Sequence, residues 1–270
     1  MTVLARVDLH APTASSRLWP LTAVALLAGS ALLQLVASLE RWVTLVAGWT
    51  RTDFSIEDHR FDYSHPAQPW ENLGSTAQFF GAGMILLVLG VIAVARATAQ
   101  GAVTPGAAGR RTESHGAAAP GAEAQGTAGR RSGDRTTRVL VGAVAASFGL
   151  TGAHAFVSGL IGFPAPLQYL PIQLLLSLVA VVGLVALAVR WLRVSPAASV
   201  ACVLLLGATL PGFYLASFQI APALVGYQSY DTTPFTETIV AASTALAALA
   251  MLAAMILASR RAPSAVSPRA

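Results

Sequence analysis

The sequence predicts an all-α integral membrane protein, a six-helix transmembrane bundle with a cap of extracytoplasmic loops. Two observations favour this fold class. Only 11% of the 270 residues are charged and 55% are hydrophobic, whereas an ordinary soluble domain has about a quarter charged residues. The mean hydropathy is +0.63, and the apolar residues form segments of about 20 residues, the length that a helix needs to cross a bilayer.

The first two segments differ in how they begin. The first covers 18–39 and is predicted to remain helical past Glu40 and Arg41. It is longer than the apolar core of a signal peptide, so we expect the chain to keep it. The second covers 73–94, and Pro69 is predicted to lie in its first turn, where proline is common.

The other four segments follow a polar stretch. Ser195 and Pro196 form a typical helix cap and first turn for the fifth segment, and Pro211-Gly212 predicts a kink in its outer half. The sixth is opened by Thr233-Pro234. The predicted spans are 139–161, 167–188, 196 to about 218, and 235–261.

The polar stretch over 97–137 consists mainly of Gly, Ala, Ser, Thr and Arg. It has too little apolar area to offset the entropy of ordering, so we expect a disordered cytoplasmic loop. The chain then divides into a cytoplasmic N-terminus (1–17), two helices with an outer loop at about 47–72 (18–96), this loop (97–137), four helices (138–261) and a cytoplasmic tail (262–270).

Arginines predict the orientation in the membrane. The chain has 17 arginines and no lysine, and all but Arg41, Arg51 and Arg60 fall on one side of the predicted spans. Positive residues mark the cytoplasmic side, so both termini are predicted to be cytoplasmic, in a plasma (inner) membrane. The Ala, Gly and Arg richness suggests a GC-rich bacterial genome.

Two groups of residues are candidates for function. The outer loop contains side chains of the types that bind divalent metals, and the spacing His59-x-x-Asp62-x-x-His65 can bring them together; the alternative is a solvated loop whose acids pair with arginines. The predicted metal ligands are Glu57, Asp58, His59, Asp62 and His65.

Ionisable residues at or near membrane depth form the second group, because such residues are costly to bury and often functional. The candidates for a ligand-binding or proton-linked role are Glu40, Arg41, Glu71, His154 and Glu237. The alternative for His154 is a neutral histidine that is hydrogen-bonded between helices.

Small and aromatic residues predict packing. Gly142, Gly149, Gly152 and Gly159 lie along one side of the third span, and we expect that side to pack against a neighbouring helix. All five tyrosines fall in the outer half or outer loops. These aromatic residues suggest a loop cap with a pocket for a lipid, a quinone-like ring or a partner.

Several functions are excluded or disfavoured. Cys202 is the only cysteine, so the chain has no internal disulfide, and no P-loop or nucleophile-elbow motif is present. The arginines flank apolar segments, which argues against nucleic-acid binding. No cofactor is predicted, with a divalent metal at the outer loop as the alternative, and the candidate partners are membrane lipid and a second membrane protein.

Three functional hypotheses remain. The sequence favours an accessory or scaffolding protein at the cell envelope, because it has no motif for a reaction. The second is a small-solute transporter, for which the kinked fifth span and His154 would supply a site. The third is an enzyme or metal-binding protein with an outward-facing site at 53–71.

Overall fold

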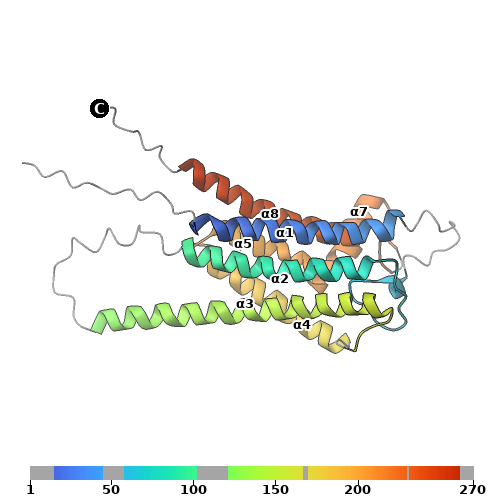
Figure 1. The fold of residues 1–270 in the computed structure, drawn as a ribbon, viewed down its shortest axis with the longest axis horizontal. Helices are drawn as coiled ribbons and strands as arrows, with labels where there is room; N and C mark the ends of the chain where they lie inside the picture. Colours follow the sequence, from blue (N-terminus) through green and yellow to red (C-terminus); the bar gives the residue numbers. More distant parts are fainter. Residues whose placement is uncertain (1–14, 45–57, 102–120, 167–169, 230, 262–270) are drawn as a thin grey trace, which may run out of the picture.

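Helices make up all the regular structure in the described part of the chain. The computed structural model describes residues 15–44, 58–101, 121–166, 170–229 and 231–261. The helices lie side by side in an elongated bundle (Figure 1). Five of them are long and apolar enough to cross a membrane, and a bent pair would add a sixth crossing. The prediction of an all-α chain with several apolar spans is therefore confirmed.

The first span ends in an unusual turn. Helix α1 (Ser15–Leu39) continues directly into η1 (Glu40–Thr44), a π-helical turn. A π-turn adds a residue to the helical repeat and changes the direction of the side chains that follow, and such turns are common at functional sites. Here Arg41 and Trp42 are both buried. The predicted continuation past Glu40 and Arg41 is thus confirmed.

Helix α2 (Thr76–Gly101) starts later than the sequence predicts. Gly74 has a φ of 52°, in the left-handed region, which separates the helix from the segment before it. Pro69 lies in that non-helical segment, so its predicted place in the first turn is wrong. The backbone N–H of Ser75 donates to Oε1 of Glu40 at 3.1 Å. The Glu40 carboxylate therefore lies at the start of α2, where the helix dipole favours a negative charge.

Helix α3 (Gly121–Ile161) begins well before the predicted third span. Together with the end of α2 at Gly101, it places helix at 97–101 and 121–137, within the segment predicted to be disordered. The prediction of disorder is wrong for these two stretches, and 102–120 lie outside the described residues. The physical reason is that extending an existing helix costs far less than nucleating one.

The fifth span is broken rather than simply kinked. Its first half, α5, begins after Ser195, whose side chain accepts a hydrogen bond from the Ala198 N–H, as predicted. The second half is bent by 71° from the first, and it begins with Thr209 as its cap. The chain turns just before Pro211, so the interruption lies where the kink is predicted, and it is a full break in the helix. The pieces are α5 (Pro196–Leu205), η6 (Leu206–Ala208), α6 (Leu210–Leu215), η7 (Ala216–Ile220) and α7 (Ala221–Val225).

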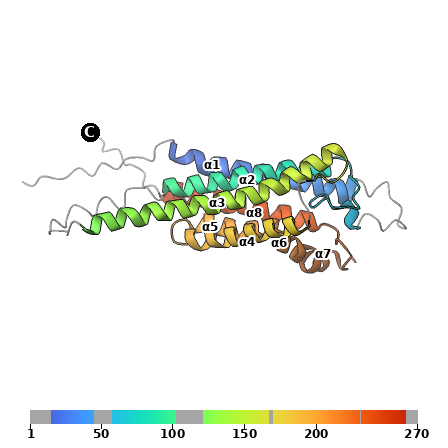
Figure 2. The same ribbon diagram turned by 90° about the horizontal axis from the view of Figure 1, so that it is seen from below.

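The remaining spans are α4 (Leu170–Trp191) and α8 (Thr236–Arg261). Helix α1 packs between α2 and α8, α2 also packs on α3, and α4 packs between α3 and α5. Figure 2 shows α6 and α7 diverging from the bundle at the end opposite the start of α3. One side of α4 presents exposed apolar side chains, as a lipid-facing helix does: Leu174, Leu175, Leu178, Val182, Val185 and Val189.

Helices α2 and α3 approach closely where both have glycine. A Cβ at Gly152 would lie 2.7 Å from Cβ of Met84 and 3.0 Å from the carbonyl oxygen of Gly81. Gly159 likewise faces Gln78, and its carbonyl accepts from the Gln78 side chain at 2.7 Å. A Cβ at Gly142 would meet nothing within 4 Å. The predicted packing side of the third span is therefore formed by its second half.

Gly152→Ala is expected to destabilise the protein, whereas Gly142→Ala is expected to be neutral. The new methyl at Gly152 forces two backbones apart, and overpacking of this kind typically costs about 1–3 kcal/mol. The methyl at Gly142 enters open space and favours the helix. The unfolding temperature of the two variants in one detergent checks this. Equal losses in both variants would contradict the close α2–α3 contact.

Candidate functional site

Two segments that are far apart in the sequence meet at one end of the bundle, which we call the loop side. They are the loop before α2, residues 58–75, and the loop before α8, of which residues 226–229 and 231–235 are described (Figure 1). The hydroxyl of Thr232 donates to Oδ1 of Asp62 at 3.0 Å and lies 3.1 Å from its Oδ2. The backbone N–H of His59 donates to Asp231 at 2.7 Å.

A buried arginine connects these loops to the helices. Arg41, on η1, is fully buried, and its Nη1 lies 2.7 Å from both Oδ1 of Asp62 and Oε1 of Glu237. One guanidinium nitrogen therefore donates to two carboxylates that come from different segments. With both carboxylates ionised, the three groups have a net charge of −1.

Trp42 completes the contacts of Glu237. Its indole Nε1 donates to Oε2 of Glu237 at 2.6 Å, so both carboxylate oxygens accept a hydrogen bond. The ring of Phe235 packs beside Trp42 with centroids 6.5 Å apart. Phe235 has a φ of 65°, which is unusual for a bulky residue and is found where the surrounding structure enforces it.

Asp62 is the titratable member of this group outside the spans. Burial raises its pKa to about 6, since removal from water disfavours the ionised carboxylate and the nearby Glu237 charge adds to this effect. The adjacent Arg41 acts in the opposite direction and offsets part of the increase. Asp62 can therefore gain and lose a proton close to neutral pH.

Two histidines, His154 and His65, lie near enough to each other to interact electrostatically. His154, on α3, is fully buried, and its Nε2 donates to the carbonyl oxygen of Pro66 at 2.9 Å. This histidine thus ties the loop to α3, in line with the alternative of a structural hydrogen bond, while its Nδ1 is buried without a hydrogen-bond partner. The Nδ1 of His65 lies 3.1 Å from the Ser64 hydroxyl. Burial, with a smaller effect of His154, lowers the pKa of His65 to about 4.

A third group is more exposed. Nδ1 of His59 lies 3.3 Å from Oδ1 of Asp58 and 3.0 Å from Oδ2 of Asp231. One ligand atom from each of these residues lies within 4.8 Å of the others, close enough for a metal ion. All three residues already have protein partners. His59 contacts both carboxylates, and Asp58 also accepts from the Arg60 N–H at 2.9 Å. Metal binding here stays a prediction.

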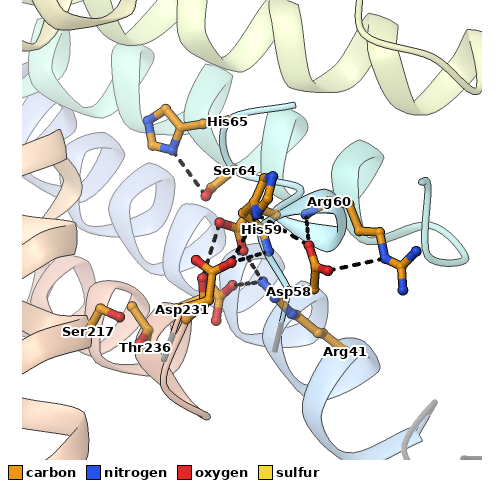
Figure 3. Close-up of polar contacts among 12 residues, drawn as sticks. Arg41, Asp58, His59, Arg60, Ser64, His65, Ser217, Asp231 and Thr236 are labelled. Carbon is orange, nitrogen blue, oxygen red and sulfur yellow. Dashed lines mark hydrogen bonds and ion pairs between the residues drawn. The ribbon is translucent and has the colours of Figure 1, made fainter. Parts of the chain in front are cut away.

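The structure separates the predicted metal ligands. Asp58 and His59 lie together, whereas Asp62 contacts Arg41 and Thr232, and His65 points away from both groups (Figure 3). Glu57 lies outside the described residues. The four described residues therefore do not form one centre, because the chain turns at 59–61 and their side chains meet different partners. Asp231, which the sequence reasoning missed, lies next to His59.

The ionisable residues predicted near membrane depth also lie at separate places in the structure. Arg41 and Glu237 are in direct contact, and Glu40 lies at the start of α2. Glu71 is exposed and lies 3.6 Å from Arg60. The sequence offered a weak signal for the missing partners, since Asp231 and Thr232 lie three and two residues before Pro234, the proline predicted to open the last span.

A cavity of about 210 Å³ lies beside Asp62, and we call it the loop-side cavity. Its wall combines carboxylates, hydroxyls and aromatic rings, and it borders the broken fifth span. A much smaller polar cavity of about 20 Å³, the inner cavity, shares His65, Gln173 and Leu210 with it. The loop-side cavity is lined by His59, Asp62, His65, Ala67, Gln173, Leu210, Phe213, Tyr214, Ser217, Phe218, Asp231 and Thr232.

Comparison of the chain with protein-family models, with curated proteins and with solved structures found no match. The function must therefore be inferred from the geometry of the site.

Arg41→Met is expected to destabilise the protein strongly. It leaves the carboxylates of Asp62 and Glu237 without their shared cation, and breaking a buried ion pair in this way costs about 3–5 kcal/mol. Arg60→Met is the matched control, since Arg60 is partly exposed and its contacts to Asp58 and Glu71 are 3.5 and 3.6 Å. We expect a change of at most about 1 kcal/mol there. Denaturant unfolding in mixed micelles measures both.

Asp62 and His65 are expected to give opposite pH dependences of stability. The raised pKa of Asp62 means that its contribution is present below pH 3.8 and lost as the pH rises through about 6. The lowered pKa of His65 means that its contribution is present above pH 6.5 and lost as the pH falls through about 4. The two effects oppose each other in the intact protein.

Single substitutions separate them. Relative to the unsubstituted protein, Asp62→Asn should gain stability as the pH rises from 4 to 7, and His65→Gln should gain stability as the pH falls over the same range. Unfolding temperatures measured at half-unit pH steps check this. Parallel curves for all three proteins would contradict the assigned pKa shifts.

Proposed function

We propose that the protein is a multi-pass membrane transporter that binds a small solute in the loop-side cavity. The observation that supports this most is the position of the cavity at the broken fifth span. Leu210, Phe213, Tyr214 and Ser217, all from the second half of that span, line it. Discontinuous helices of this kind form the substrate sites of many secondary transporters.

Neighbouring side chains accept hydrogen bonds from the backbone N–H groups at the break in the fifth span. A helix interruption frees backbone N–H groups that must find partners inside a membrane. The Leu210 N–H donates to the hydroxyl of Ser177 on α4 at 3.0 Å, and the Gly212 N–H donates to Thr209 at 3.4 Å. The hydroxyl of Ser177 lines the inner cavity as well. The freed groups are thus satisfied beside the cavities.

The inner cavity extends the polar surface toward the middle of the bundle. It is lined by Ser147 and Thr151 from α3 and by Ser177 from α4. It shares three lining residues with the loop-side cavity, so the two cavities are neighbours, and the proposed route for the solute passes through both. A transporter would open this route alternately to the two sides of the membrane.

Most of the described arginines lie at the end of the bundle opposite the loop side, and positive residues mark the cytoplasmic side. On this basis we place the loop side outside the cell, in a plasma membrane. The accessory role that the sequence favoured stays a prediction, because nothing in the described part of the chain identifies a partner surface. An enzyme with a metal centre also stays a prediction, and only Asp58, His59 and Asp231 lie close enough together to supply its ligands.

Cysteine labelling tests alternating access without knowledge of the solute. Cys202 is the only native cysteine and is replaced by alanine first. A cysteine at Ala67, exposed in the loop-side cavity, should react with a membrane-impermeant methanethiosulfonate added from the loop side. A cysteine at Ser147, in the inner cavity, should react with the same reagent added from the other side, in inverted vesicles.

Ser30→Cys is the control, because Ser30 is fully buried on α1 and lines neither cavity. We expect no labelling of that cysteine from either side. If the cysteine at position 147 also stays unreactive from the side opposite the loops, the protein does not alternate and the transporter proposal fails.

A further inference from the structure

The loop-side cavity has an excess of negative charge. Two carboxylates line it, from Asp62 and Asp231, and no arginine is among the described residues of its wall. The nearest buried cation, Arg41, lies behind Asp62, has no exposed side-chain surface and is shared with Glu237. Arg41, Asp62 and Glu237 together have a net charge of −1 when both carboxylates are ionised. The cavity therefore favours a positively charged occupant.

Asp62 has room for an additional donor on the cavity side. Its Oδ1 accepts from Arg41 at 2.7 Å and from Thr232 at 3.0 Å, whereas Oδ2 contacts only the Thr232 hydroxyl, at 3.1 Å, among the described residues. The side chain is 18% exposed although its neighbour Arg41 is not exposed at all. A positive group in the cavity can therefore approach Asp62 directly.

Part of the cavity wall is aromatic, from Phe213, Tyr214 and Phe218. Tyr214 and Phe218 are stacked with centroids 5.8 Å apart, and the ring of Phe213 meets the edge of His65 at 5.9 Å. Aromatic faces attract weakly hydrated cations, and quaternary ammonium groups are the usual partners of such walls. A wall that combines carboxylates with aromatic rings thus favours an organic cation over a metal ion.

We infer that the loop-side cavity binds a small organic cation of the ammonium type, which pairs with Asp62 and competes with a proton for that carboxylate. This inference rests on the proposed function, because it names the class of solute that the transporter would take.

Competition with a proton follows from the groups around Asp62. Arg41 faces it from η1, Glu237 from α8, and Asp231 from the loop before α8; Tyr63, His59 and His65 belong to its own loop. Burial raises the pKa of Asp62 to about 6, so part of the population is protonated at mildly acidic pH. A cation that prefers the ionised carboxylate must, by linkage, bind more weakly as the pH falls.

Three probes of the same shape test the charge requirement. They are choline, its neutral analogue 3,3-dimethylbutan-1-ol and the anion 3,3-dimethylbutanoate. Binding to the intact protein in nanodiscs is measured by calorimetry at pH 7.5. We expect choline to bind at least about tenfold more tightly than the neutral analogue, the factor that about 1.4 kcal/mol of cation–π and ion-pair attraction gives, and the anion not to bind.

Asp62→Asn should remove the preference for choline, while Glu71→Gln should leave it unchanged. Glu71 is the matched control because it is an exposed carboxylate on the same loop that does not line the cavity. In the unsubstituted protein, a change from pH 7.5 to pH 5.0 should weaken choline binding about tenfold, the fall in ionised Asp62 expected one unit below a pKa of about 6. In Asp62→Asn the same change should have little effect.

Each other result overturns the inference. Equal binding of choline and the neutral analogue would show a solute site without charge selection, which leaves the proposed transporter intact. Choline binding that ignores both Asp62 and pH would place the cation elsewhere. Binding of none of the three probes would exclude this ligand class, while the cysteine labelling at positions 67 and 147 decides separately whether the protein alternates between two sides.

Discussion

The loop side of this protein depends on one buried arginine. Arg41 cannot lose its proton in a protein and is fully buried, so it requires carboxylate partners in the apolar interior. It finds them in Asp62, from the loop before α2, and in Glu237, from the first turn of α8. Three segments separated by up to 196 residues are thereby held at fixed positions. Asp62, one of these two carboxylates, also lines the loop-side cavity, so the same contacts position part of the cavity wall.

The second constraint is the need to satisfy backbone groups where the helices are irregular. The fifth span turns at Thr209, and a Cβ at Gly212 would collide with the carbonyl oxygen of Leu206. Only glycine allows this turn, and hydroxyls of Thr209 and Ser177 satisfy the N–H groups that it frees. Both π-helical turns, η1 and η7, contribute residues to the same end of the bundle. The irregular backbone is thus concentrated at the candidate site.

Reading the sequence identified individual residues better than their arrangement. Arg41 and Glu237 were recognised as candidates because ionisable residues at membrane depth are costly. In the structure Asp58 and His59 lie together, whereas Asp62 and His65 contact other partners, because spacing along a loop does not define the direction of each side chain. Asp231 was missed, since its nearness to His59 depends on how two distant loops pack.

The sequence by itself determined that the chain forms several apolar helices of membrane-crossing length, and their order, because helix length and apolarity are local properties. It also predicted the helix cap at Ser195 and the interruption near Pro211, which depend on neighbouring residues alone. Only the tertiary structure decided that Arg41 bridges two carboxylates, that Glu40 lies at the start of α2, and that the broken span borders a cavity. Such contacts depend on helix rotation and loop packing, which are set by the sum of many weak interactions across the bundle.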